Sequence, residues 1–266
     1  MPPLLSVLKH FSPRKADVHA PSEEAWAQLW PALPLLQGLS DDDAERLRLK
    51  VGLVLSAKDI QGAAGQEVDD LQRLWIAVPA ALMLLNLDMG WFHGWASIIL
   101  YPGKFVSRHE YEDGDGVVHD NRRPLVGEAR YDGPVVLSWE EVQQDMRGDE
   151  PGHVVIHELA HKLDMLNGDT NGFPPLPRNM DRGYWTEVFS EAYRDHCHKV
   201  RWDEELIDAY AASKPGEFFA VSCETFFTDP HTLREAYPQV YQQLRELFQQ
   251  NPVARLPRRT TELDAL

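Results

Sequence analysis

One segment, HELAH from His157 to His161, constrains this chain of 266 residues more than any other. It lies inside an apolar stretch that predicts a helix from Gly152 to Leu166. Positions four apart on a helix share one face, so both imidazoles can bind the same ion while Glu158 lies beside them. Neutral imidazoles hold Zn²⁺, and a neighbouring carboxylate can take the proton of an attacking water. The pattern predicts one zinc ion per chain, with His157 and His161 as ligands and Glu158 as general base.

The residues around the motif decide between this interpretation and an ordinary amphipathic helix. HExxH also arises by chance, and its histidines can then be solvated and unliganded. Here the neighbours are apolar, from Val154 to Ile156 and again at Leu159, Ala160 and Leu163. Two histidines and a glutamate in such surroundings need polar partners, because burying polar groups without them is costly. The setting favours a metal site.

A catalytic zinc site needs a third protein ligand and one open position. The extended pattern HExxHxxGxxH does not supply the ligand, because Asp164 and Asn167 stand at its glycine and third histidine positions. Two later glutamates compete for the role: Glu191 in a predicted helix, and Glu217 at the start of the apolar segment EFFAVSCETFF. Their spacing from the motif does not separate them.

Two further acidic residues each have a functional and a structural interpretation. Glu224 is seven residues past Glu217, so it shares that helix face and either accepts a histidine N–H or lies on the surface. Asp164 lies on the ligand face of its helix. It either orients an imidazole or the following loop, or it serves as a capping or turn residue. The sequence leaves both choices open.

Hydrophobic spacing and capping residues place the chain in the α+β class. The first ninety residues are expected to be mainly helical, and two to four strands are expected after Trp91, in WASIILYPGKFV and GPVVLSW. The predicted helices cover Glu23 to Trp30, a segment capped by Ser40 that runs to about Leu55, Asp69 to Leu87, Gly152 to Leu166, Trp185 to Val200, Glu217 to Phe227 and Leu233 to Phe248.

The length allows one large domain or two small ones, at roughly 150 residues per domain. No internal repeat or Gly/Ser linker divides the sequence. We expect a single domain over residues 1–266. It comprises a helical N-terminal part (1–90), a core that carries the motif (91–250) and a frayed Pro/Arg/Thr-rich tail (251–266).

Composition excludes several classes of partner. The chain has 42 Asp and Glu against 26 Lys and Arg, and its net charge of −16 opposes binding to nucleic acid and to anionic membranes. The longest apolar run, Leu74 to Leu87, is too short to cross a bilayer, and the N-terminus has no signal-peptide pattern. Cys197 and Cys223 form no CxxC pair. We expect a cytoplasmic protein with reduced cysteines, no direct nucleic-acid partner and no membrane partner.

Two other features are expected to lie outside the site. The cluster Asp195-His196-Cys197-His198 contains potential ligands, but adjacent helical positions point in different directions and do not share an ion. The acidic stretch from Glu110 to Asp115 is expected to be a solvated loop.

Longer segments go beyond the motif: HELAHKLDMLNGD, IDAYAASKPGEFFAVSCETFF and FHGWASIILYPGKFV. Together with GPVVLSW and the total length, they resemble the Mlc titration factor A family of zinc metallopeptidases. The resemblance covers most of the chain and is weakest in the first sixty residues and the tail. It implies a zincin-like metallopeptidase core, with a small mixed sheet, an HExxH active-site helix and a mainly helical N-terminal part.

The resemblance also implies roles for individual residues. Glu217 becomes the third zinc ligand beside His157 and His161, which demotes Glu191. The family has a tyrosine seven residues before that ligand, and Tyr210 stands at this position. Its phenol is expected to stabilise the oxyanion of the tetrahedral intermediate.

Two parts of the family comparison concern the surroundings of the site. The chain departs from the family pattern at Lys214-Pro215-Gly216, which leads into Glu217. Zincins lay an extended substrate along an edge strand that precedes the metal helix, and Val135 to Leu137 is the segment we expect to take this place.

The leading hypothesis is a zinc-dependent metallopeptidase with a peptide substrate, and the family implies aminopeptidase-like action on short peptides. The alternative is a regulatory protein that sequesters a transcriptional repressor of sugar uptake, of the Mlc type, with the zinc site secondary. A purely structural zinc site is the third option, which three ligands without an evident fourth disfavour.

Overall fold

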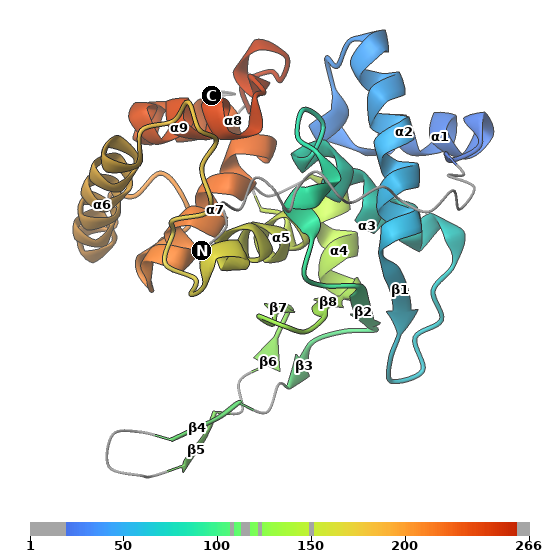
Figure 1. Ribbon diagram of the computed structural model, residues 1–266, viewed down its shortest axis with the longest axis horizontal. Helices are drawn as coiled ribbons and strands as arrows, with labels where there is room; N and C mark the ends of the chain where they lie inside the picture. Colours follow the sequence, from blue (N-terminus) through green and yellow to red (C-terminus); the bar gives the residue numbers. More distant parts are fainter. Residues whose placement is uncertain (1–19, 107–108, 113–117, 122–123, 149–151, 260–266) are drawn as a thin grey trace, which may run out of the picture.

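The computed structural model describes residues 20–106, 109–112, 118–121, 124–148 and 152–259. The helices lie above a small mixed sheet in the view of Figure 1, and the structure belongs to the α+β class, as predicted. Among the described residues no helix is long and apolar enough to cross a membrane.

The N-terminal helices follow the sequence signals closely. They are α1 (Glu23–Leu29), α2 (Asp41–Ala57) and α3 (Asp70–Met83). The hydroxyl of Ser40 accepts the N–H of Asp43, which confirms the predicted cap of α2. α3 is buried on nearly every side from Leu74 to Met83, as its apolar sequence predicts, but it ends four residues before Leu87.

The central sheet has the order β1-β2-β8-β7. Strands β1 (Asp59–Gly62), β2 (Ser97–Tyr101) and β8 (Val135–Ser138) are parallel, and β7 (Gly127–Ala129) runs antiparallel to β8. β1 is a strand within the part expected to be mainly helical. Its sequence DIQG buries one side chain, Ile60, so it carries almost no hydrophobic pattern that could reveal it.

The segment expected to be the edge strand proves to be internal. β8, which contains Val135 to Leu137, pairs with β2 on one side and with β7 on the other. The expectation that this segment receives an extended substrate is therefore wrong. The edges of this sheet are β1 and β7, and β7 is the one that packs against α5; its sequence GEA has no β-branched or aromatic residue to mark it.

Two strand pairs lie outside the central sheet, so the region holds more strands than the two to four expected. β3 (Phe105–Val106) pairs with β6 (Pro124–Leu125), and β4 (His109–Glu112) pairs with β5 (Val118–Asn121) in a hairpin that projects from the body of the protein (Figure 1). The acidic stretch from Glu110 is thus a strand as far as Glu112 and not a loop; its last three residues lie outside the described part of the chain.

The C-terminal half is built from six helices within the described residues: α4 (Trp139–Arg147), α5 (Val154–Asp164), α6 (Arg182–Lys199), α7 (Pro215–Thr228), α8 (Pro230–Ala236) and α9 (Pro238–Phe248). α4 was not foreseen. The single helix predicted from Leu233 to Phe248 is wrong, because Pro238 starts a new helix and Tyr237 before it takes a non-helical conformation.

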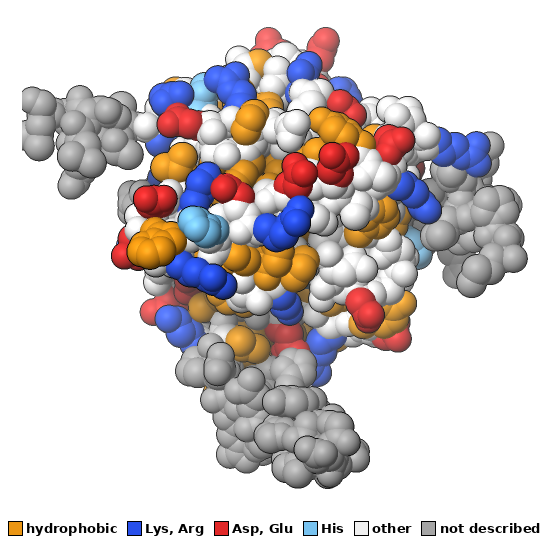
Figure 2. Space-filling model, turned by 90° about the vertical axis from the view of Figure 1, so that its left-hand side faces the viewer, with side chains coloured by type: hydrophobic (Ala, Val, Ile, Leu, Met, Phe, Trp, Pro, Cys, Tyr) orange, Lys and Arg blue, Asp and Glu red, His pale blue; other side chains and the backbone are white. Residues whose placement is uncertain are grey.

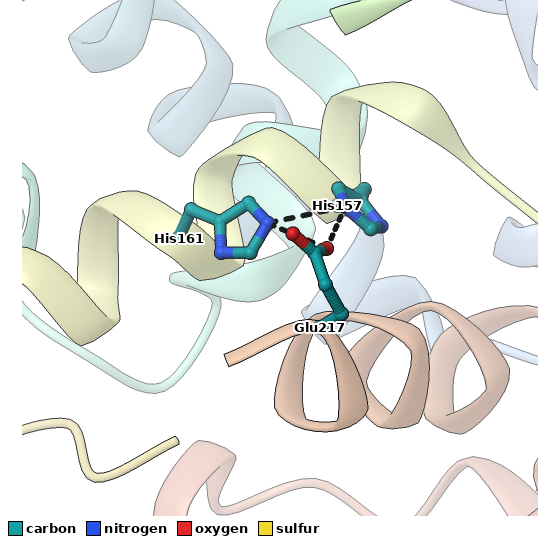
Figure 3. Close-up of side chains that lie close together, drawn as sticks. All are labelled: His157, His161 and Glu217. Carbon is teal, nitrogen blue, oxygen red and sulfur yellow. Dashed lines mark hydrogen bonds and ion pairs between the residues drawn. The ribbon is translucent and has the colours of Figure 1, made fainter. Parts of the chain in front are cut away.

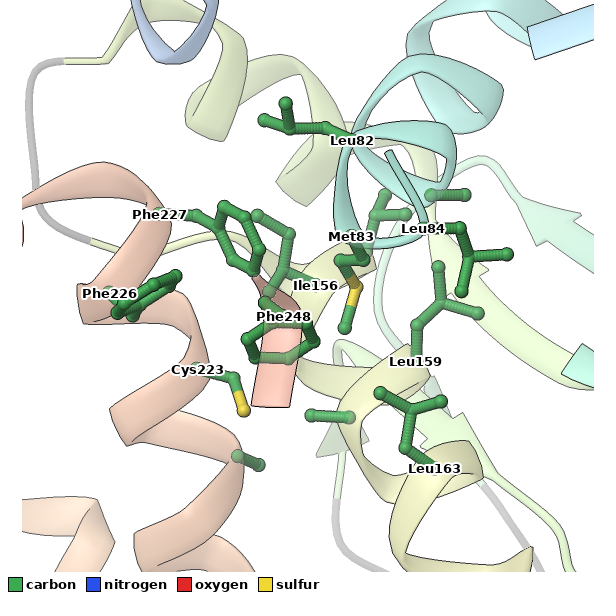
Figure 4. Packing of buried hydrophobic residues seen from close by; sticks show 14 of the residues in the cluster. Leu82, Met83, Leu84, Ile156, Leu159, Leu163, Cys223, Phe226, Phe227 and Phe248 are labelled. Atoms are coloured by element: carbon green, nitrogen blue, oxygen red, sulfur yellow. The ribbon is translucent and has the colours of Figure 1, made fainter. Parts of the chain in front are cut away.

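The core forms where α5 packs between α3 and α7. Ile156, Leu159 and Leu163 on α5 meet Met83 on one side and the phenylalanines of α7 and α9 on the other (Figure 4). Cys223 is buried in this layer and forms no disulfide, and Cys197 is also free, as expected. The helix that carries the HExxH motif is therefore held on both sides by the core.

The tail does not fray within its described part, contrary to expectation. A 3₁₀ turn forms at Pro252–Ala254, and the buried guanidinium of Arg255 donates to the carbonyl oxygens of Leu35 and Gln37 at 2.6 and 3.0 Å. These contacts tie the end of the described chain to its N-terminal helices. Residues 260–266 lie outside the described part.

Charges of both signs share the surface of the C-terminal half. Figure 2 shows this face, where acidic, basic and apolar side chains are interspersed among the described residues rather than gathered by type. The negative net charge is therefore not concentrated on this face.

Candidate metal centre

The start of α5 is fixed by side chains from two other helices. The N–H of Val154 donates to Oδ2 of Asp145 on α4 at 2.6 Å, and the N–H of His153 donates to Oε2 of Glu224 on α7 at 2.8 Å. His153 itself provides no side-chain cap. Because the first N–H groups of a helix have no partner inside it, these two carboxylates define where α5 begins.

Three potential ligand atoms meet beneath α5. Figure 3 shows the imidazoles of His157 and His161 on one face of the helix, with the carboxylate of Glu217 reaching toward them from α7. Nε2 of His157 and Nε2 of His161 lie 2.9 and 3.0 Å from Oε2 of Glu217, and the two Nε2 atoms lie 3.1 Å apart. Glu217 lies 56 positions past His161 in the sequence, so it is the tertiary fold that brings the two side chains together.

These spacings suit a tetrahedral metal ion. With metal–ligand bonds of about 2.0–2.1 Å, tetrahedral ligand atoms lie about 3.3 Å apart, close to the spacings of this triangle. Within the described residues, His157, His161 and Glu217 form the one His/Cys/Asp/Glu group of this kind, and the set is compatible with a metal ion.

The three groups have strongly perturbed proton affinities. Burial alone would raise the pKa of Glu217, but hydrogen bonds with His157 and His161 outweigh it and hold the pKa well below its usual range. Burial likewise opposes the charge on His157, yet the carboxylates of Glu224 and Glu217 hold its pKa well above the usual value. Burial lowers the pKa of His161. The carboxylate of Glu217 is therefore ionised at neutral pH.

Glu224 takes the first of its two possible roles. Its Oε1 lies 2.5 Å from Nδ1 of His157, while its Oε2 accepts the N–H of His153. A carboxylate at Nδ1 accepts a hydrogen there and leaves Nε2 free to act as an electron-pair donor. Nδ1 of His161 has no such partner among the described residues.

Asp164 serves the loop that follows the metal helix rather than an imidazole. Its carboxylate accepts the N–H groups of Gly172 and Phe173 at 2.7 and 2.9 Å, and burial raises its pKa to about 6. The same loop lies against the start of α7, since a Cβ atom added at Gly216 would be 2.8 Å from the carbonyl oxygen of Thr170. Gly216, the last residue of the segment that departs from the family pattern, therefore permits this loop to pack closely beside Glu217.

Glu158 faces the edge strand. Its side chain is buried, and burial raises its pKa to about 7. A Cβ atom added at Gly127 on β7 would lie 2.7 and 2.8 Å from Cγ and Cδ of Glu158, closer than non-bonded carbon atoms approach. Lys162 on the same helix donates to the carbonyl oxygens of Arg130 and Gly133 in the turn after β7. The backbone of β7 and of the turn after it therefore packs directly against side chains of α5.

Sequence reasoning did not find Gly127. An isolated glycine in or beside a strand can mark a close backbone approach, but here the strand itself was not predicted, so this signal had no context.

Tyr210 lies at the rim of the site. It belongs to the 3₁₀ turn η8 (Ala209–Ala212), its side chain is exposed, and its ring centroid lies 6.1 Å from that of His157. Desolvation and the negative charges of Glu217 and Glu158 raise its pKa to about 12, so the phenol keeps its proton at neutral pH. Lys214 also reaches the rim, with Nζ 3.2 Å from Oε1 of Glu217.

The competing candidates lie elsewhere. Glu191 lines a shallow groove between α6 and α9 together with Asp195 and Tyr237. His196 of the Asp195–His198 cluster is buried and contacts Tyr237 and the backbone of Asp208 rather than its neighbours in sequence. The fold separates both from the group at His157.

Comparison with known proteins gives a consistent result. The family model described as "Glucose-regulated metallo-peptidase M90" matches residues 9–249. A protein named Mlc titration factor A from Edwardsiella ictaluri is 37% identical over 235 residues, covering 85% of this chain and 89% of that protein. Its namesake from Serratia proteamaculans is 36% identical over 255 residues, covering 93% and 96%. The one from Escherichia coli O9:H4 is 34% identical over 238 residues, covering 88% and 89%.

These matches extend over most of the chain and include the residues that meet at the candidate metal centre. The chain therefore belongs to the glucose-regulated metallo-peptidase family M90, together with proteins named Mlc titration factor A.

Proposed function

We propose that this protein is a zinc metallopeptidase in which His157, His161 and Glu217 hold one zinc ion. The observation that carries the proposal is the triangle of two imidazole nitrogens and one carboxylate oxygen, 2.9–3.1 Å on each side, next to the buried carboxylate of Glu158. Structural zinc sites have four protein ligands, whereas the described residues offer three. This supports a catalytic site within a zincin-like core.

Glu158 is the proposed general base. A zinc ion held by the three ligands supplies Lewis-acid chemistry, which acidifies water and polarises a carbonyl group. Glu158 accepts a proton from the attacking water and delivers it to the amine that leaves. Because burial raises the pKa of Glu158 to about 7, its affinity for the proton suits both steps near neutral pH.

Tyr210 is the proposed oxyanion donor. Its phenol lies at the rim next to His157 and stays protonated, so its hydroxyl can donate a hydrogen bond to the negative charge that develops on the carbonyl oxygen. The exposed position of the side chain makes it accessible to a substrate that enters from solvent.

β7 is the proposed docking strand. It is one of the two edge strands of the central sheet and its backbone lies against Glu158, so an extended peptide that adds to this edge brings a main-chain carbonyl close to the base. The family resemblance favours a short peptide with a free amino end. We accordingly propose aminopeptidase-like action in the cytoplasm.

The decisive experiment combines metal analysis with cleavage of peptide libraries. The wild type is expected to hold about one zinc per chain and to cleave peptides with free amino ends faster than N-acetylated ones. Glu158→Gln is expected to keep the zinc and lose hydrolysis, with Glu191→Gln as the matched carboxylate control that keeps both. Equal cleavage by Glu158→Gln and the wild type would remove the proposed mechanism.

A second function is favoured by the names of the relatives, Mlc titration factor A. We propose that the protein also binds a repressor of the Mlc type and so removes it from solution. Binding of purified repressor should be measured for the wild type, for Glu158→Gln and for protein treated with a chelator. Binding that survives both changes while hydrolysis stops would show two separable functions. Absence of binding in all three would exclude this role.

A further inference from the structure

Three side chains on α6 donate hydrogen bonds to the turn that carries Tyr210. The hydroxyl of Tyr193 donates to the carbonyl oxygen of Ala212 at 3.2 Å, and Sγ of Cys197 donates to the same oxygen at 3.6 Å. Nε2 of His196 lies 3.2 Å from the carbonyl oxygen of Asp208. Positions 193, 196 and 197 are three and four apart, so they form one face of α6 that is turned toward η8.

The turn itself is small. The side-chain carboxylate of Asp208 accepts a hydrogen bond from the N–H of Tyr210 at 2.8 Å, and the backbone carbonyl oxygen of Asp208 accepts one from the N–H of Ala211. The hydroxyl of Ser213 donates to the carbonyl oxygen of Tyr210. A 3₁₀ segment of four residues has little stability of its own, because its hydrogen bonds are few and poorly aligned. Its position is therefore set by what it is attached to.

His196 provides the most deeply buried of these attachments. Its ring is fully buried and packs against Phe218, the residue next to Glu217, with 5.7 Å between ring centroids. A carbonyl oxygen only accepts, so Nε2 must carry the hydrogen and donate to Asp208. Nδ1 then faces the hydroxyl of Tyr237, 3.2 Å away. Burial lowers the pKa of His196, which keeps the ring neutral and this arrangement intact at neutral pH.

A buried histidine with two partners is commonly just a packed core residue. Here the carbonyl oxygen that it binds belongs to Asp208, whose side chain caps the turn of Tyr210, while the Tyr210 side chain is 55% exposed. Its ring lies 6.1 Å from that of His157 and its phenol interacts with Glu217, and both contacts require the turn to keep its place. The location of its hydroxyl over the metal ligands therefore depends on the backbone of the turn.

We propose that His196 is a positioning residue for Tyr210: it anchors the turn to α6 so that the phenol lies over the metal ligands. This inference rests on the proposed role of Tyr210 in peptide hydrolysis. It assigns a function to one member of the Asp195–His198 cluster that involves no metal ion.

A double-mutant cycle tests the proposal. Tyr210→Phe is expected to lower kcat about 100-fold. His196→Leu, which cannot donate, is expected to lower kcat about tenfold or more with KM and zinc content unchanged. In the Tyr210→Phe background the same change should have no further effect, because the group that it positions is gone. His196→Gln, whose amide can still donate to Asp208, should recover most of the activity, and His198→Leu on another face of α6 serves as control.

Hydrogen exchange gives a second measurement that needs neither metal nor substrate. In chelator-treated protein, His196→Leu should raise the exchange rate of the amides of Ala211 and Ser213 at least tenfold while the amides of α5 keep theirs. If His196→Leu does not fold, Tyr193→Phe, which removes one donor to the turn and keeps the ring, should give the same pattern with smaller changes.

The outcomes separate the two proposals. Full activity in Tyr210→Phe would contradict the role of Tyr210, and the exchange experiment would then decide alone whether His196 holds the turn. If Tyr210→Phe is impaired but His196→Leu keeps the wild-type kcat, the positioning role is wrong. Equal losses from His196→Leu in both backgrounds, or a His196→Gln variant as slow as His196→Leu, would overturn it as well.

Discussion

Oε1 of Glu224 lies 2.5 Å from Nδ1 of His157, although the two residues are 67 positions apart. The contact fixes which nitrogen of the ring faces Glu217. Carboxylates behind a histidine ligand typically change metal affinity by a factor of 10 to 100. We expect Glu224→Ala to weaken zinc binding by about this factor, measured by competition with a chromophoric chelator.

Glu224→Gln is a milder change, because its amide oxygen can still accept from Nδ1, and it should lose much less affinity. Glu235→Ala on the exposed face of α8 is the control and should bind zinc normally. Wild-type affinity in Glu224→Ala would contradict the orienting role.

Substitution of Glu217 and substitution of Glu191 are expected to have different effects on zinc binding. Glu217 lies within 3.0 Å of both histidine nitrogens, whereas Glu191 lines a groove between α6 and α9. Glu217→Gln should weaken zinc binding by more than about 100-fold, and Glu191→Gln should leave it unchanged. The measurement is zinc retained after dialysis against a graded series of chelator concentrations. Loss of zinc from Glu191→Gln alone would reverse the assignment.

Gly127→Ala should separate hydrolysis from metal binding. The added methyl group overlaps Glu158 and must displace either that side chain or β7, and misplacement by about 1 Å can cost 100-fold in rate. We expect kcat to fall about 100-fold with zinc content unchanged. Gly103→Ala is the matched control, since its added Cβ atom meets only the flexible end of Glu140 at 3.2 Å. Normal kcat in Gly127→Ala would show that the close approach is unimportant for the reaction.

The raised pKa of Asp145 is expected to make the stability of the fold depend on pH. Burial raises its pKa from 3.8 to about 7. Between about pH 4 and 7 the folded chain thus holds a proton that the unfolded chain has released, so the free energy of unfolding falls as pH rises through this window. At 1.36 kcal/mol for each pH unit, the loss from this residue is at most about 4 kcal/mol.

Asp145→Asn keeps an acceptor for the N–H of Val154 but cannot ionise. Urea unfolding of chelator-treated protein at pH 5 and pH 8 should therefore show a smaller loss of stability for Asp145→Asn than for the wild type. Glu246→Gln on the exposed face of α9 should retain the wild-type difference. An identical difference in Asp145→Asn would mean that the carboxyl group titrates normally.

The sequence predicted best the elements whose stability is local. Ser40 caps α2 as expected, and the apolar segments of α3, α5, α6 and α7 form helices within a few residues of the predicted ends. Strands β1 and β7 were missed because each has only three or four residues and neither alternates apolar with polar side chains. β1 also depends on pairing with β2, a strand far along the chain. The assignment of residues 1–266 to one domain stays a prediction.

In the candidate site, too, the residues that local structure brings together were predicted, and those that depend on tertiary packing were not. The histidine pair and Glu158 are local, since helical geometry alone places them together. The choice between Glu191 and Glu217, and the position of Gly127, depend on how α6, α7 and the sheet pack around α5. Spacing along the chain carries no such information, and it was the resemblance to a known family that favoured Glu217 as the proposed third ligand.

Gly127 has a consequence for selectivity. At Gly127, the point where it meets Glu158, the edge strand presents backbone and no side chain. A peptide that pairs with this strand forms hydrogen bonds through its own main chain, which every sequence offers equally. Recognition along β7 is therefore indifferent to sequence, and any preference for particular residues must be imposed by the other walls of the site.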